Sequence, residues 1–268
     1  MGLDFAATTE SEVVALFVDR AAAGLGSWVV TANLDHLRRF AAEPATRELI
    51  AEADVVVADG MPVVVASRVA GMPLPERIAG SSMILPIGRR AAQRGASVFL
   101  IGGEPGVADR ACERMVDAAP GLRVAGTHCP PHGFEHDEDE LRTIERLLVD
   151  AAPDIVLLAL SFPKTDNLIR RLRPLLPGAS FMGVGIALSF LAGDRRRAPT
   201  WMRRAGVEWL HRLVSEPRRL WRRYLVDGLP FAARLTAAAA VARVQRTLGG
   251  PWFSHPVPDV PTIGAPRA

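Results

Sequence analysis

Six short runs of apolar, largely β-branched residues constrain the fold most, because each ends in a polar or glycine-rich turn. The runs are SWVVTAN (27–33), ADVVVADG (53–60), ASVFLIGG (96–103), LRVAGTHC (122–129), PDIVLLAL (153–160) and ASFMGVG (179–185). Helical patterns lie between them, for example over residues 34–52, 81–94, 106–118 and 137–151. Strands that alternate with helices form βαβ units and a mostly parallel sheet. Runs that are apolar nearly throughout are typical of strands covered on both faces, so we expect an α/β fold with helices on both sides of the sheet.

Polar or glycine residues stand at the end of most of these runs. In parallel sheets the binding crevice lies outside the carboxyl ends of the strands. We therefore take as candidate site residues Thr31, Asn33, Asp59, Gly60, Gly102, Gly103, Ser161, Gly183 and Gly185.

Charge is divided unevenly along the chain. Residues 195–268 contain 14 arginines and four acidic residues, whereas residues 1–194 contain 18 basic and 25 acidic residues. The net charge of +3 therefore hides an acidic body and a strongly basic C-terminal part. An acidic body repels a nucleic-acid duplex, and no nucleic-acid-binding motif stands out, so we expect no nucleic-acid partner.

Cysteine usage and hydropathy favour a cytoplasmic protein. Cys112 and Cys129 are the only cysteines, too few for a disulfide framework or a set of metal ligands. We find no secretory signal and no apolar run of about 18 residues that would span a membrane. The alanine-rich segment near residue 235 carries Arg234, Arg243 and Arg246, and it predicts a surface helix instead.

The segment APTWMRRAGVEWLHRLVSEPRRLWRRYLVDGLP, residues 198–230, concentrates arginines, three of the five tryptophans and the only tyrosine. Its apolar residues recur at helical spacing: Val207, Leu210, Leu213, Val214, Leu220, Trp221, Tyr224 and Leu225. Pro217 is expected to divide the segment into two helices, since proline is tolerated in a first turn. Such a basic amphipathic segment suits an anionic membrane surface, with Trp and Tyr at headgroup level. A solvated helical face is the alternative.

Asp59 stands at the mouth of an apolar strand in VVVADGMP. A carboxylate there can act as a general base or bind a ribose hydroxyl, and desolvation by the strand raises its pKa toward the range useful for a base. The alternative is an aspartate that caps the next helix, with Gly60 and Pro62 shaping the turn.

The segment FLIGGEPGVADRA, residues 99–111, joins a strand to a helix through a glycine-rich turn. Glycines let the backbone approach a ligand, and a helix N-terminus favours phosphate. The spacing is neither that of a dinucleotide-binding fingerprint nor that of a Walker A loop. The turn therefore suits either a diphosphate or a tight connection without a ligand.

Two groups of residues invite a metal-site interpretation, and we reject both. Asp137 and Asp139 could bind the metal of a nucleotide diphosphate, but they begin a helical pattern, where acidic residues suit the helix dipole. Prolines at 130 and 131 prevent the regular helix that would bring together His128, His132 and His136. We expect no metal.

Taken in order, these motifs resemble the WecG/TagA/CpsF bacterial glycosyltransferases. The matching segments are TANLDH (31–36), ADGMPVV (58–64), GMPLPERIAGSSM (71–83), FLIGGEPGVA (99–108), APDIVLLALSFPK (152–164), GVG (183–185) and LAGDRRRAPTWMRRAGVEWLHRLVSEPRRLWRR (191–223). The resemblance implies a Rossmann-like α/β body with a basic C-terminal appendage at the membrane. It also implies the inverting transfer of a sugar, often N-acetylmannosamine, from a UDP-sugar to an undecaprenyl-diphosphate-linked saccharide.

The same resemblance assigns roles to single residues. Asp59 matches the catalytic base, which takes the proton from the acceptor hydroxyl. The positions that match donor-binding residues are Thr31, Asn33, Arg77, Gly102, Gly103, Lys164 and Gly185. Those that match arginines reaching the diphosphate of donor or lipid acceptor are Arg212, Arg219 and Arg222. UDP-sugar is then a substrate, and neither a cofactor nor a metal is expected, because arginines can meet the charge on the diphosphate.

Three positions depart from the family pattern. Thr165 replaces a glutamine that would contact the sugar, Ile186 replaces a glycine, and Ser189 replaces an aspartate. These departures support a second hypothesis, a catalytically altered or inactive member that binds or scaffolds in the same pathway. The transferred sugar under the first hypothesis is N-acetylmannosamine or a related hexose or uronic acid.

The expected organisation has three parts. Residues 1–194 form the Rossmann-like body, residues 195–248 a basic amphipathic helical appendage, and residues 249–268 a proline-rich loose tail. The implied location is the cytoplasm, peripheral on the inner face of the cell membrane. A homo-oligomer is compatible with the sequence, because the appendage can complete the site of its own subunit or that of a neighbour.

Overall fold

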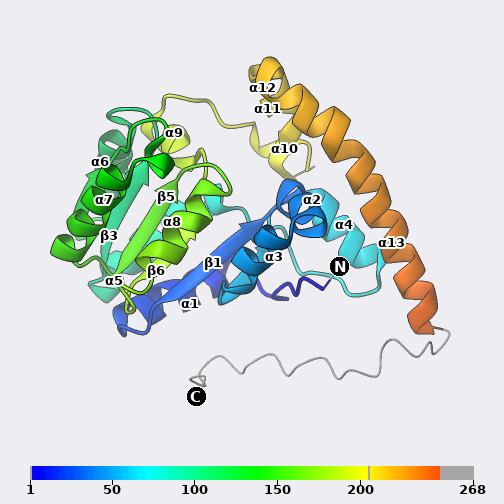
Figure 1. Ribbon diagram of the computed structural model, residues 1–268, viewed down its shortest axis with the longest axis horizontal. Helices are drawn as coiled ribbons and strands as arrows, with labels where there is room; N and C mark the ends of the chain where they lie inside the picture. The colour runs from blue at the N-terminus through cyan, green and yellow to red at the C-terminus, as the bar shows by residue number, and fades with distance from the viewer. Residues whose placement is uncertain (1, 205, 248–268) are drawn as a thin grey trace.

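A six-stranded sheet, parallel throughout, forms the centre of the protein in the computed structural model, which describes residues 2–204 and 206–247 (Figure 1). The strands are β1 (Ser27–Ala32), β2 (Val55–Ala58), β3 (Ser97–Gly102), β4 (Arg123–His128), β5 (Ile155–Ala159) and β6 (Ser180–Gly183), in the spatial order β2-β1-β6-β5-β3-β4. Each lies within one of the six apolar runs, so the predicted strands and the predicted parallel sheet are confirmed. All six carboxyl ends lie at one edge, and that edge carries the site.

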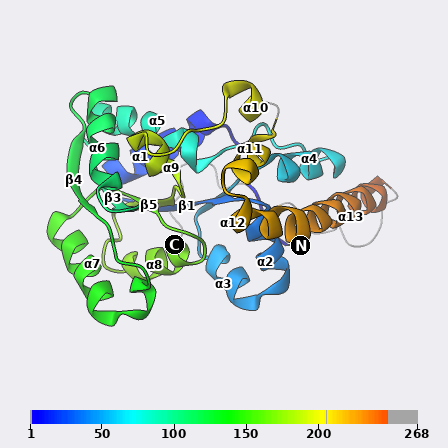
Figure 2. The ribbon, with the colours of Figure 1, turned by 90° about the horizontal axis from the view of Figure 1, so that it is seen from above.

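Helices cover both faces of the sheet. They are α1 (Glu10–Ala22), α2 (Leu34–Ala42), α3 (Pro44–Ala51), α4 (Met61–Val69), α5 (Gly80–Arg94), α6 (Val107–Ala118), α7 (Glu138–Ala151), α8 (Lys164–Leu172) and α9 (Ala187–Ala192), with a 3-10 turn η1 (Phe134–His136). Figure 2 shows α2, α3, α7 and α8 on one side and α1, α5, α6 and α9 on the other. Alternation along β1 explains the two cores, because Trp28 and Val30 join the first and Val29 the second. The Rossmann-like α/β class is confirmed.

The segment 34–52 was expected to be one helix and forms two. α2 ends before Glu43, which is extended, with φ −117° and ψ 113°. Pro44 follows it and begins α3. The proline disfavours a helical conformation at the residue before it, so the chain turns at Glu43 and restarts.

The C-terminal part is helical and lies beyond the carboxyl ends of the strands and alongside α4 (Figure 1). It comprises α10 (Thr200–Arg204), α11 (Glu208–Ser215), α12 (Pro217–Trp221), a π-helical stretch η2 (Arg222–Gly228) and α13 (Leu229–Thr247). From here on, the appendage means these helices, residues 200–204 and 206–247. α11 ends just before Pro217, which opens α12, so the predicted break is confirmed. Leu235 and Ala239 of α13 are buried in the core that includes α4. The loose tail expected over residues 249–268 lies outside the described residues.

One helix in the described residues is long and apolar enough to cross a membrane by length and composition, contrary to the sequence-based expectation. It runs through α12, η2 and α13, from Pro217 to Thr247, and its most apolar window has a mean hydropathy of 1.4. The expectation was wrong because Asp227 and Arg234 interrupt the run of apolar letters without lowering the average enough to exclude it. Only 17% of that window is buried in the protein, so most of its surface is open to solvent or another partner.

Candidate active site

A cavity of about 800 Å³ opens at the carboxyl edge of the sheet. Its walls come from the ends of β1, β2, β5 and β6, from the loops after β3 and β4, and from the appendage helices of the same chain. A cavity of this size accommodates a nucleotide-sized ligand. The appendage thus completes the site of its own chain in this structure.

The structure brings most of the predicted site residues to this cavity. Those that line it are Thr31, Asn33, Asp59, Arg77, Gly103, Lys164, Gly185, Arg212 and Arg219. Gly102 and Arg222 do not line it. Gly102 instead lies where β3 passes β5, and a Cβ there would lie 2.7 Å from the Ala159 carbonyl oxygen. Arg222 is exposed on the outer side of its helix, and the next residue, Arg223, faces the cavity.

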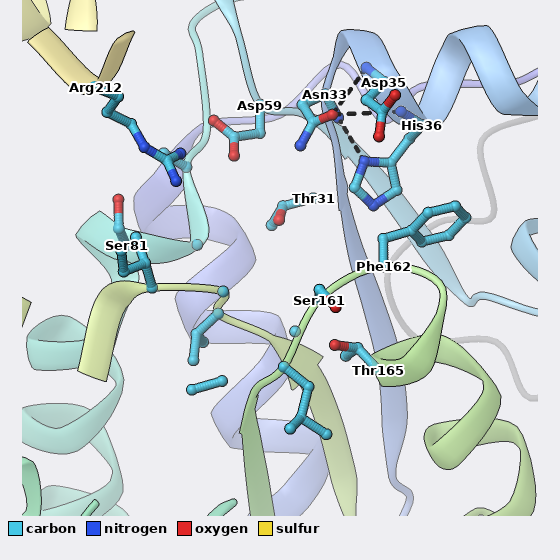
Figure 3. A pocket seen from close by; sticks show the side chains of 18 of the residues that line it. Thr31, Asn33, Asp35, His36, Asp59, Ser81, Ser161, Phe162, Thr165 and Arg212 are labelled. Atoms are coloured by element: carbon cyan, nitrogen blue, oxygen red, sulfur yellow. Dashed lines mark hydrogen bonds between the residues drawn. The ribbon is translucent and has the colours of Figure 1, made fainter. Parts of the chain in front are cut away.

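Asp59 follows β2 and is fixed by its backbone N–H, which donates to the carbonyl oxygen of Ala32 at 2.9 Å. Its carboxylate has no hydrogen bond or ion pair to another described side chain, so it is free to meet a ligand. In Figure 3 the side chain of Arg212 points toward it. The pKa of Asp59 is raised to about 6, mainly by burial and also by Glu208, against the opposing effect of Arg77, Arg212 and Arg197. A carboxylate with a pKa near 6 is mostly ionised at neutral pH and remains a useful proton acceptor.

Glu208 joins the appendage to the body beside Asp59. From the start of α11 its carboxylate meets Nη1 of Arg77 at 3.2 Å and Nε of Arg197 at 3.8 Å. Arg197 also donates to the hydroxyl of Ser81 at 3.0 Å and to the carbonyl oxygen of that residue at 3.2 Å. The side chain of Glu208 is only 12% exposed, so these contacts are weakly screened by water.

Two more acidic side chains hold arginines at the rim. Glu216 meets Arg195 at 2.7 Å and Arg219 at 2.5 Å. On α2, Asp35 meets Arg38 at 3.0 Å and Arg223 of the appendage at 3.5 Å. Arginines therefore line the cavity in two places, around Arg212 and Glu216 of the appendage and beside Asp35 of α2.

Neutral polar groups from β1, α2 and the start of α8 also line the cavity, beside the ion pairs of Asp35. Asn33 is the N-cap of α2, and its side-chain oxygen accepts hydrogen bonds from the backbone N–H groups of Asp35 and His36, at 3.0 and 3.3 Å. The backbone N–H of Asn33 in turn donates to Nδ1 of His36 at 3.4 Å. Figure 3 shows Thr31, Ser161 and Thr165 facing the same space. The capping alternative considered for Asp59 thus applies to Asn33, which both caps a helix and lines the cavity.

The three departures from the family pattern lie in the cavity wall. Thr165, Ile186 and Ser189 all line it. The methyl group of Thr165 packs against Gly183, where an added Cβ would lie 2.9 Å away. Beside it Asp166 is buried, and burial raises the pKa of its carboxyl to about 7. This wall therefore carries less negative charge at neutral pH than an ordinary aspartate would give it.

The cavity residue Lys164 forms an ion pair near the loop after β4. Lys164 pairs with Glu135, and this contact lowers the pKa of Glu135. Across residues 2–204 and 206–247, no three His, Cys, Asp or Glu side chains gather in a group that could hold a metal ion.

Sequence reasoning missed Glu208, Arg223 and His36 as cavity residues, and Arg197 as the partner of Glu208. His36 had a usable signal, because it stands three positions after Asn33, the spacing of a capping box. Glu208 had a weaker one, as one of four acidic residues in a basic segment. Arg223 had no such signal in the sequence, because tertiary packing decides which side of its helix faces the cavity.

The fold and the site define a Rossmann-like α/β protein in which one carboxylate faces a set of arginines across a nucleotide-sized cavity. A family model described as Glycosyl transferase WecG/TagA/CpsF family matches residues 1–245, so the chain belongs to this family of glycosyltransferases. Two relatives are named N-acetylglucosaminyldiphosphoundecaprenol N-acetyl-beta-D-mannosaminyltransferase. The one from Bacillus spizizenii is 30% identical over 87% of this chain and 86% of its own. The one from Bacillus subtilis is 29% identical over 66% of this chain and 67% of its own.

The raised pKa of Asp59 has a consequence for stability. A carboxyl whose pKa is higher in the folded than in the unfolded state destabilises the folded protein once it ionises, so the penalty is present above pH 6 and fades as the pH falls toward 3.8. We expect Asp59→Asn to raise the free energy of unfolding on the order of 2–3 kcal/mol at pH 8 and by much less near pH 4. Urea unfolding at both pH values measures this, with the exposed Asp117→Asn as control. A gain for Asp59→Asn that is equal at both pH values, or no gain, would contradict the assigned environment.

Proposed function

We propose that the protein is an inverting glycosyltransferase of cell-envelope polysaccharide synthesis. It transfers N-acetylmannosamine, or a related hexose or uronic acid, from a UDP-sugar to a polyprenyl-diphosphate-linked saccharide. The names of the two Bacillus relatives support the sugar and the acceptor class. The observation that carries the proposal is Asp59, a carboxylate with a raised pKa and no ion-pair partner, facing arginines across the cavity.

The proposed reaction needs one base and several cations. Asp59 takes the proton from the acceptor hydroxyl as that oxygen attacks the anomeric carbon of the donor sugar. The bond from the anomeric carbon to the UDP oxygen breaks, and its electron pair leaves with UDP. Attack opposite the leaving group inverts the anomeric centre, so a second, nucleophilic carboxylate is not required.

Arginines meet the negative charge that develops on the leaving diphosphate. Arg77, Arg212, Arg219 and Arg223 all line the cavity. The buried Nε of Arg212 has no hydrogen-bond partner, and a buried donor of this kind is stabilised when a ligand oxygen reaches it. Charge-assisted hydrogen bonds that strengthen as the diphosphate departs lower the barrier. We therefore propose that no metal is required for transfer.

A second candidate function rests on the altered wall. Thr165 and Ile186 stand where the family pattern has residues with other shapes, and both line the cavity. A protein that binds the pathway's intermediates without turning them over is the corresponding alternative. Retention of Asp59 with its raised pKa favours the enzyme.

Transfer assays test the function directly. We expect the full chain to transfer sugar from at least one of several UDP-sugars to an N-acetylglucosaminyl-diphospho-polyprenyl acceptor, with a chelator present. Asp59→Asn should lower turnover about 10²–10⁴-fold through loss of the general base, whereas Asp117→Asn on the exposed face of α6 should not. Saturable UDP binding without any transfer would favour the scaffold. Unchanged turnover in Asp59→Asn would remove the assigned base.

We further propose that the appendage places the enzyme at the anionic inner surface of the cell membrane. Apolar and cationic residues share the outer side of its helices: Trp201, Arg218, Trp221, Arg222, Leu225, Val226 and Leu229 are exposed. Leu235 and Ala239 hold α13 against the body, which suits a helix lying in the interface better than one that crosses it. Arg222, which the cavity does not use, then faces lipid headgroups.

Vesicle binding tests this placement. We expect the full chain to bind vesicles that contain phosphatidylglycerol, and the double variant Trp201→Ser/Trp221→Ser to bind markedly less, because these side chains are 66% and 51% exposed. Leu25→Ser is the matched control, since Leu25 is 61% exposed but lies at the amino end of β1, away from the appendage. Equal binding by both variants in a flotation assay would contradict the placement.

A further inference from the structure

One cavity residue beside the start of α2 has no assigned role. His36 lies in the first turn of α2 and lines the cavity. Its ring packs against Phe162, with 4.3 Å between ring centroids, and Arg39 covers the same Phe162 ring at 5.8 Å. The imidazole is therefore held from one side by the start of α2 and from the other by the loop before α8 (Figure 3).

The hydrogen bond from Asn33 fixes which nitrogen carries the proton. The backbone N–H of Asn33 can only donate, so Nδ1 of His36 must accept and is unprotonated. In the neutral ring the proton is then on Nε2. Burial lowers the pKa of His36 to about 4, an effect that Asp35 opposes and that Arg223 and Arg39 reinforce, so the ring is neutral at physiological pH.

Nε2–H is left as a donor without a partner. This nitrogen makes no hydrogen bond to a described residue. It is also not fully enclosed by the protein, so it is open to the cavity that His36 lines. A neutral N–H donor recognises an uncharged oxygen, such as a hydroxyl or an acyl carbonyl, without attracting a phosphate as an arginine does. The neutral polar groups of Thr31, Asn33 and Ser161 line the cavity with it, and the nearest cation that lines the cavity, Arg223, is paired with Asp35 at 3.5 Å.

We propose that His36 is a sugar-binding residue whose Nε2–H donates to a hydroxyl or acetamido oxygen of the transferred sugar. This inference rests on the proposed function, because it takes the ligand to be a UDP-sugar. The arginines near Asp59 then hold the diphosphate, and the neutral groups around His36 hold the sugar. Asn33 contributes twice, by its own position in the cavity and by fixing the tautomer of His36 through its backbone.

Substitutions can separate this role from helix capping. Glutamine at this position of a capping box accepts from the N-cap backbone through its oxygen and still offers an N–H₂ donor, so His36→Gln keeps both functions. Phenylalanine keeps an aromatic ring against Phe162 but has neither an acceptor nor a donor. His136→Gln is the matched control, because the His136 side chain is 85% exposed and lies outside the cavity.

The decisive readout is the affinity of the full chain for UDP-N-acetylmannosamine compared with its affinity for UDP, measured by calorimetry. We expect His36→Phe to weaken UDP-N-acetylmannosamine binding about tenfold while UDP binding stays within about twofold, since a single neutral hydrogen bond to the sugar is lost. His36→Gln should recover most of the difference, and His136→Gln should match the wild type. A purely structural role would lower both affinities together, or neither.

The outcomes distinguish the two levels of the proposal. If His36→Phe binds both ligands as the wild type does, or loses both equally, the sugar-binding role is overturned and the proposed function stands. If His36→Phe does not fold, the comparison is made with His36→Met, which also lacks a donor and fills similar space. If the wild type binds neither UDP nor UDP-N-acetylmannosamine, the proposed function fails and the inference fails with it.

Discussion

The ion pairs of Glu208 are the interaction on which the site depends. The Glu208 carboxylate from the appendage meets Arg77 of the body and Arg197 of the segment between α9 and α10. Both contacts lie beside Asp59. Without Glu208, two arginines would face each other near the base and hold its pKa down. With it, the base keeps a raised pKa and the appendage has a fixed seat on the body. The same carboxylate therefore docks the appendage and helps to keep the pKa of Asp59 raised.

The same arrangement explains why the site lies where it does. A parallel sheet delivers its strand ends to one edge, which supplies Asp59, Asn33 and the glycines. The body, although acidic overall, contributes Arg38, Arg77 and Lys164 to that edge. The basic appendage adds Arg212, Arg219 and Arg223 to it. The uneven charge along the sequence thus corresponds to a basic appendage that supplies arginines to a cavity in an acidic body.

Much of this could be predicted from the sequence, and the misses have physical reasons. The six strands, Asp59 at the mouth of β2 and the break at Pro217 follow from local patterns of apolar residues and turns. Glu208 could not be paired with Arg77, because the two are 131 residues apart and meet only when the appendage docks. Arg222 was expected in the cavity, but burial of Leu220 sets the phase of the helix and turns Arg223 inward instead.

The pH dependence of kcat/KM for sugar transfer, compared between the wild type and Glu208→Gln, tests the central claim that Asp59 is a base tuned by the docked appendage. In the wild type, activity should fall on the acid side with an inflection near pH 6, because kcat/KM reports the ionisation of the free enzyme. Glu208 raises the pKa of Asp59, so removing its charge should move that inflection to lower pH. An acid limb at the same pH in both proteins, or one near the ordinary pKa of an aspartate in the wild type, would contradict the claim.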